Sequence, residues 1–267
     1  MSTVELEASG AIAIVRISNP PNGYMNETVV RDLDRAMRRI DQNPNLKVVV
    51  LTGGLPDVFV QHYDLHELET LCEKLVERRR GSGGNFSHVP ERPIDLIFRR
   101  LENSDRIVIA AINGNAMGGG CELAITCDFR LMQSGPYLIG LPEIRIGMLP
   151  GAGGTQRLTR LVGVAKGLDL MLHGRRLSPE QALEAGLVHE VVDGNVLDRA
   201  MERAHDLAQL PAKALAYVKR LAYCATEMPL YAALDLERSL FLDLMSSPEG
   251  LAMISDLNAR GGDFRSL

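Results

Sequence analysis

Strand-like and helical segments alternate over most of the chain, up to about residue 192. Residues 11–17 (AIAIVRI) and 47–52 (KVVVLT) are apolar and rich in β-branched side chains, so they are predicted to be strands. Between them, residues 26–40 carry apolar side chains at helical spacing behind an asparagine N-cap. Residues 178–186 (SPEQALEAG) indicate another helix, with a capping box at its start and a glycine at its end. Strands separated by helices need crossover connections, so the pattern predicts a layered α/β fold.

From residue 195 onward only helices are predicted. Pro211, Pro229 and Pro248 each stand where a new helix can begin, and apolar stripes follow them. The chain is therefore expected to divide into a core of residues 1–194 and a helical region of residues 195–267. A region with this many apolar side chains can pack onto another subunit or onto the core of its own chain, and the sequence leaves both arrangements open.

Composition and charge narrow the range of partners. The chain has 267 residues and a net charge of −5, which argues against a nucleic-acid partner. It shows no signal-peptide pattern and no apolar run approaching about 18 residues, so neither an export signal nor a membrane span is expected. The four cysteines lack metal-type spacing, which favours free thiols in the cytoplasm and no metal site.

Residues 77–93 (ERRRGSGGNFSHVPERP) differ from their surroundings by their basic triplet, glycines and prolines. This composition predicts a mobile surface loop. The arginine triplet is too short for a nucleic-acid patch. Neither GSGG in this segment nor GAGGT at residues 151–155 has the context of a nucleotide-binding motif.

Three consecutive glycines stand where a strand passes into a helix. Residues 106–114 (RIVIAAING) predict a buried strand, and residues 118–128 (GGGCELAITCD) follow with an apolar helical surface. Two interpretations are open. The glycines can form a tight turn beside a solvated Glu122, or their backbone N–H groups can face a negative oxygen beside a catalytic Glu122.

A second carboxylate, Glu143, lies in the apolar stretch LIGLPEIRIG. It can be a surface residue on a turn, or it can pair with Glu122 in an acid/base site. In such a pair, helix polarity should keep Glu122 ionised, while apolar surroundings should let Glu143 hold its proton. Carboxylates whose pKa values are pushed apart in this way can serve as base and acid.

Three segments together resemble the enoyl-CoA hydratase/isomerase (crotonase) superfamily. They are INGNAMGGGCELAITCDFRL, LPEIRIGMLPGAGGTQRLTRLVG and LSPEQALEAGLVHEVV, and the resemblance runs from about residue 9 to residue 225. It implies an α/β spiral of repeated ββα units, a C-terminal helical region that builds trimers or hexamers, and an acyl-coenzyme A substrate. By motif match it also implies an oxyanion hole made by the N–H groups of Tyr63 and Gly119, with Glu122 and Glu143 as the catalytic pair.

The sequence departs from this family beside the second oxyanion position. Gln61 and His62 stand where small residues are usual, and Tyr63 also replaces a small residue. A backbone N–H can act as an oxyanion donor whatever side chain its residue carries. The pocket, however, gains polar groups, which disfavours a plain fatty-acid substrate. His62 is either a third acid/base group or a pocket-wall side chain. The residues expected to contact the acyl-CoA are Tyr24, Gln61, His62, Asp64, Leu65 and Gly118.

Hydration of an enoyl-CoA is the favoured function, because both carboxylates are present. Two glutamates suffice for the proton transfers, so no metal or redox cofactor is expected, and coenzyme A enters with the substrate. The alternatives are another reaction on the same platform (isomerisation, racemisation, decarboxylation or carbon–carbon cleavage) or a non-catalytic trimeric binding protein.

Overall fold

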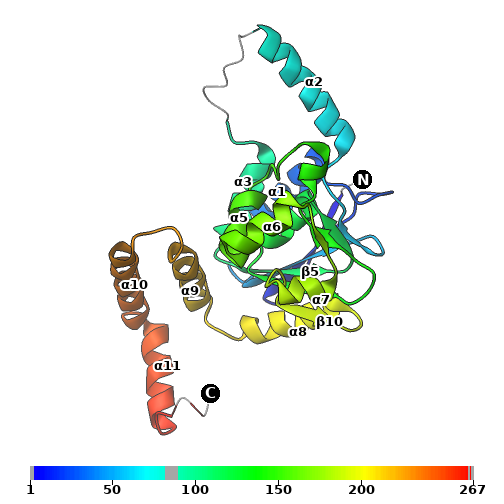
Figure 1. Ribbon diagram of the computed structural model, residues 1–267. Coiled ribbons are helices and arrows are strands. Elements are labelled where there is room, and N and C mark those ends of the chain that lie inside the picture. The colour runs from blue at the N-terminus through cyan, green and yellow to red at the C-terminus, as the bar shows by residue number, and fades with distance from the viewer. Residues whose placement is uncertain (1–2, 82–89, 264, 266–267) are drawn as a thin grey trace. The chain divides into compact units, whose positions relative to one another are not determined.

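The computed structural model describes residues 3–81, 90–263 and 265 (Figure 1). Two sheets form the core. The first has six strands in the order β1 (Val4–Ser9), β2 (Ile12–Ile17), β3 (Val48–Gly53), β5 (Ile107–Ile112), β7 (Phe129–Gln133) and β10 (Glu190–Val192). The second has four short strands in the order β4 (Val58–Val60), β6 (Asn115–Met117), β8 (Ile139–Gly140) and β9 (Arg176–Leu177).

Successive strands alternate between the two sheets. β3, β5 and β7 lie in the first sheet and are followed by β4, β6 and β8 in the second. Within each sheet these strands pair in parallel. Helices return the chain after each strand pair, which confirms the α/β spiral of repeated ββα units. Every residue of β3 and β5 is buried, as expected for central parallel strands covered on both faces.

The helices of this core begin with α1 (Glu27–Asp41), α2 (Leu65–Gly81), α3 (Pro93–Glu102) and α4 (Gly119–Ile125). After a 3-10 helix at Glu143–Ile146 follow α5 (Gly154–Val162), α6 (Val164–Leu172), α7 (Pro179–Glu184) and α8 (Val196–Ala208). The predicted caps are confirmed: Asn26 accepts from the N–H of Val29, and Ser178 and Gln181 form the capping box of α7.

Two expectations need correction. The segment 77–93 is not a loop at its start, because α2 continues through the arginine triplet to Gly81. Arginine is a good helix former, and positive charge is favourable at a helix C-terminus. Residues 82–89 of that segment lie outside the described residues, and α3 begins at Pro93.

The division into units falls one helix later than the sequence suggested. The chain separates into Met1–Gln209 and Leu210–Leu267. Helix α8 belongs to the first unit because it packs against β3, β5 and β7, with Val196, Ala200 and Ala204 buried.

The described residues of the second unit form three α-helices, α9 (Ala212–Cys224), α10 (Leu230–Met245) and α11 (Pro248–Ala259). Asp243 on α10 accepts a hydrogen bond from the hydroxyl of Tyr217 on α9 and forms a salt bridge with Lys213, also on α9. Neither α10 nor α11, both fully described, has a buried residue. Within the described part of the chain, no helix combines the length and the apolar character needed to cross a bilayer.

Candidate active site

The three glycines make the sharp passage from β6 into α4. Gly118 has φ 49°, and a β-carbon added there would lie 2.9 Å from Oε1 of Glu143. A β-carbon on Gly120 would lie 1.8 Å from the backbone oxygen of Val60, which is shorter than any van der Waals contact. Both positions therefore require glycine, one for its conformation and one for close packing. Gly119 differs, because a β-carbon there would find its nearest atom, the backbone N of Tyr63, at 3.4 Å.

The backbone of Gly119 therefore lies beside the N–H group of Tyr63. The residues flanking Tyr63 are fixed by a short parallel pairing, in which Met25 donates to the His62 oxygen at 2.8 Å and accepts from Asp64 at 2.7 Å. Among the described residues, neither the Gly119 N–H nor the Tyr63 N–H donates a hydrogen bond. Two adjacent and unengaged donors are the arrangement that an oxyanion hole needs.

Glu122 lies in the first turn of α4 and is buried, with 3% of its surface exposed. Its Oε1 accepts hydrogen bonds from the N–H groups of Ala152, at 2.7 Å, and Gly154, at 2.8 Å. Glu122 is therefore not the solvated residue of the first interpretation. Burial raises the pKa of its carboxyl, while the two N–H donors and the charges of Arg157 and Arg92 oppose that shift.

Two arginines hold the loop that binds Glu122. Arg157 donates to the carbonyl oxygen of Ala152 at 2.7 Å and forms a two-pronged pair with Glu102 at 2.5 and 2.7 Å. Arg92 donates to the carbonyl oxygen of Gly151. The loop therefore offers its N–H groups to Glu122 and its oxygens to the arginines.

Glu143 begins the 3-10 helix and is electrostatically coupled to Glu122. Burial and the negative charge of Glu122 raise the pKa of Glu143 to about 7. Among the described residues, its buried Oε2 has no hydrogen-bond partner. The sequence predicts a raised pKa for Glu143 alone. In the structure burial raises the pKa values of both Glu122 and Glu143, and helix polarity does not prevent the shift of Glu122.

The polar residues before α2 are brought to the same place. The rings of Tyr24 and His62 stack with centroids 4.5 Å apart, and Cβ of His62 would lie 3.7 Å from a β-carbon on Gly118. Nδ1 of His62 lies 2.7 Å from the Tyr63 carbonyl oxygen, which can only accept, so Nδ1 carries the proton. Oε1 of Gln61 is buried and has no partner among the described residues.

Asp64 and Leu65 adjoin this cluster at the start of α2. Oδ1 of Asp64 accepts from the N–H of His66 at 2.8 Å, so its carboxylate caps the helix. Leu65 is 51% exposed. The structure therefore gives Asp64 a structural contact that the sequence did not indicate.

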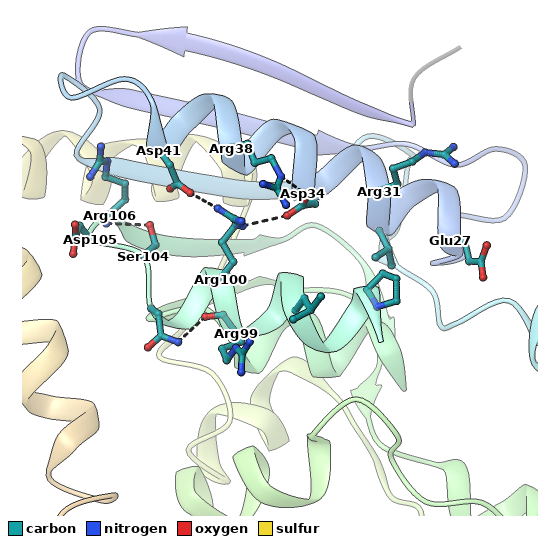
Figure 2. A pocket seen from close by; sticks show the side chains of 14 residues that line it. Glu27, Arg31, Asp34, Arg38, Asp41, Arg99, Arg100, Ser104, Asp105 and Arg106 are labelled. Atoms are coloured by element: carbon teal, nitrogen blue, oxygen red, sulfur yellow. Dashed lines mark hydrogen bonds and ion pairs between the residues drawn. The ribbon is translucent and has the colours of Figure 1, made fainter. Parts of the chain in front are cut away.

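A groove of about 870 Å³ between α1 and α3 is separate from these residues (Figure 2). Figure 2 shows Arg100 reaching across it to Asp34, at 3.1 Å, and Asp41, at 2.7 Å. Asp34 also pairs with Arg38 at 2.7 Å. None of the predicted site residues lines this groove. Its charges join the two helices across the groove.

Comparison with known proteins places the chain in a family. The family model described as enoyl-CoA hydratase/isomerase matches residues 7–255. A short-chain-enoyl-CoA hydratase from Clostridium acetobutylicum is 32% identical over 251 residues, which cover 93% of this chain and 92% of that protein. A probable enoyl-CoA hydratase from Rhizobium meliloti is 33% identical over 94% of this chain and 93% of its own length. The crystal structure of an enoyl-CoA hydratase from Bacillus anthracis superimposes with a TM-score of 0.85 at 28% identity, covering 97% of this chain and 96% of that one. The chain therefore belongs to the enoyl-CoA hydratase/isomerase family.

Proposed function

We propose that this protein adds water to the 2,3-double bond of an enoyl-CoA thioester. The observation that carries this proposal is the grouping of two unengaged backbone donors with two electrostatically coupled carboxylates, buried Glu122 and half-buried Glu143. Gly119 lies against Tyr63, and the neighbouring Gly118 lies against the Glu143 carboxyl. The negative charge of Glu122 in turn raises the pKa of Glu143. The relatives named as enoyl-CoA hydratases support the same reaction.

In this mechanism the thioester oxygen accepts hydrogen bonds from the N–H groups of Gly119 and Tyr63. Negative charge gathers on that oxygen as water attacks C3 and an enolate forms. Donors already in place stabilise the charge, and loss of one such donor costs roughly 2.7–4 kcal/mol in the transition state.

The two carboxylates divide the proton transfers. Ionised Glu122, held by the loop N–H groups through Oε1, takes a proton from the attacking water. Glu143, whose pKa of about 7 lets it carry a proton near neutral pH, delivers that proton to C2. Both transfers move protons only, so the proposed reaction needs no metal or redox cofactor, and coenzyme A arrives as part of the substrate.

The acyl group is proposed to meet the polar cluster before α2. Tyr24 stacks on His62, and His62 lies beside Gly118, which faces Glu143. Gln61, Asp64 and Leu65 adjoin His62 along the chain. Gln61 carries a buried acceptor without a partner among the described residues, which favours an acyl chain with a polar substituent over a plain hydrocarbon.

Assembly into a trimer or hexamer and a cytoplasmic location belong to the same proposal. Helices α10 and α11 expose Leu242, Leu251 and other large apolar side chains, which favours burial against another subunit. No disulfide joins any of the four cysteines, all of which the structure describes, and this is consistent with a reducing compartment.

The test is to incubate the purified protein with a panel of enoyl-CoA and hydroxyacyl-CoA thioesters and to follow the products by mass spectrometry. Hydration predicts that an enoyl-CoA gains the mass of one water. Rearrangement at unchanged mass would indicate isomerisation, and fragments would indicate cleavage. No conversion of any thioester would contradict an enzymatic function on these substrates.

A further inference from the structure

The side chain of Tyr63 reaches a residue of α2. Its hydroxyl donates a hydrogen bond to Oε2 of Glu67 at 3.0 Å. Burial and the neighbouring Glu67 carboxylate raise the pKa of Tyr63, so the hydroxyl keeps its proton and remains a donor. A large side chain at this position is therefore tied to a definite partner.

The same oxygen of Glu67 binds a second group. It accepts the backbone N–H of Glu27, at 3.0 Å. Glu27 is the first residue of α1, and the N–H groups of a first helical turn have no partner inside the helix. One carboxylate oxygen thus connects the start of α1, the first turn of α2 and the ring of Tyr63.

The backbone on both sides of Tyr63 is anchored as well. The pairing with Met25 fixes His62 and Asp64, and Asp64 caps α2. The contact through Glu67 adds a third anchor, which acts on Tyr63 itself. The Tyr63 N–H, one of the two donors beside the glutamate pair, is the group whose direction these anchors determine.

We propose that Glu67 is a positioning residue, which through the Tyr63 hydroxyl holds the Tyr63 N–H in line with the thioester oxygen. This inference rests on the proposed function, because it assigns that N–H to the oxyanion hole. Displacement of a reacting group by about 1 Å can lower a rate about 10²-fold, so an anchor of this kind affects turnover without touching the substrate.

The alternative is that the contact only stabilises the fold. A structural contact would change the midpoint of thermal unfolding and leave the bound thioester unaffected. A positioning contact changes how strongly the carbonyl is polarised. The two are separated by turnover together with the infrared stretching band of the thioester carbonyl.

Four variants of the full-length protein make the test. Tyr63→Phe removes the hydroxyl but keeps the ring, and Glu67→Ala removes the acceptor. Glu67→Gln keeps an oxygen that can accept from both donors. Glu69→Ala removes an exposed carboxylate from the same helix and is the matched control. Hydration of crotonyl-CoA gives kcat and KM, and bound butyryl-CoA with a ¹³C-labelled thioester carbonyl gives the band.

We expect Tyr63→Phe and Glu67→Ala each to lower kcat about 10-fold, less than the 10²–10³-fold cost of deleting an oxyanion donor. KM should change little, and the carbonyl band should move toward its position in free butyryl-CoA. Glu67→Gln should retain most of the activity, and Glu69→Ala should match the wild type. The double variant Tyr63→Phe/Glu67→Ala should be no worse than either single variant, because both remove the same contact.

Folded Tyr63→Phe and Glu67→Ala variants with wild-type kcat and an unshifted carbonyl band would overturn the positioning role while leaving the proposed function intact. A wild-type protein that neither binds butyryl-CoA nor hydrates crotonyl-CoA would instead contradict the proposed function for these thioesters, and the role of Glu67 with it.

Discussion

Glu122 is buried and Glu143 is half-buried, and the two carboxylates have different surroundings. Glu122 has one oxygen fixed by two loop N–H groups, whereas the buried Oε2 of Glu143 has no partner among the described residues. Two N–H bonds stabilise the charged form of the Glu122 carboxyl, whereas the Glu143 carboxyl has one backbone N–H contact, that of its own residue, and is stabilised less. The pair can therefore hold one proton in common near neutral pH, with Glu143 as its carrier.

Removing either charge without changing shape should reveal this division. We expect Glu122→Gln and Glu143→Gln each to lower hydration turnover by about 10²-fold or more, with acyl-CoA binding largely kept. Steady-state kinetics and a binding titration measure the two effects separately. Full hydration by Glu143→Gln would contradict its role as the acid. Loss in that variant alone, with Glu122→Gln active, would favour a one-base reaction such as isomerisation.

The pH dependence follows from the same pair. Hydration starts with one shared proton, so kcat/KM should fall as pH rises through about 7, where Glu143 loses it. Dehydration of the hydroxyacyl-CoA should show the same alkaline limb, because its starting state also carries one proton. A profile that stays flat from about pH 6 to about pH 9 would be inconsistent with Glu143 as the proton carrier.

At the scale of single elements, α4 depends on how closely its first turn approaches β4. Gly120 lies against the Val60 carbonyl, whereas Gly119 has room for a β-carbon. We therefore expect Gly120→Ala to destabilise the protein by about 1–3 kcal/mol or more, since a packed core resists added volume. Gly119→Ala is the matched control and should unfold close to the wild-type temperature. Equal thermal stability of the two variants would show that the approach of α4 to β4 is looser than in this structure.

The elements that the sequence predicted are those with strong local signals. Helices α1 and α7 have side-chain caps, and β3 and β5 are continuous apolar runs. The strands of the second sheet have two or three residues each, too few for periodicity to show. The sequence predicts a loop at the end of α2 because glycines follow the arginines closely.

The candidate site shows a similar limit. The two glutamates are predicted from their surroundings in the sequence and from the motif resemblance, and the two oxyanion positions from the resemblance; the structure brings these residues together. The backbone donors to Glu122 cannot be predicted from the sequence. Every non-proline residue has the same backbone N–H, and the sequence does not show where that N–H points. The contact between Tyr63 and Glu67 joins residues four apart, but nothing in their types distinguishes it from a solvated pair.

At the scale of the whole molecule, the C-terminal unit exposes a large apolar surface. Phe241 and Leu242 of α10 are 59% and 64% exposed, respectively, and Leu251 of α11 is 64% exposed. We expect a trimer or a dimer of trimers in solution, measured by light scattering at micromolar concentration. Leu242→Glu should shift the protein toward monomers, with an unchanged circular dichroism spectrum as the control. A wild-type monomer would defeat this expectation.

The central claim is that one oxygen of a bound thioester lies between two backbone donors beside the glutamate pair. A crystal structure with a bound unreactive acyl-CoA tests it most directly. We expect the backbone nitrogens of Gly119 and Tyr63 both to lie about 2.7–3.2 Å from the thioester oxygen, with C2 facing Glu143 and C3 facing Glu122. A thioester oxygen that points away from either nitrogen, or an acyl-CoA bound elsewhere on the molecule, would contradict it.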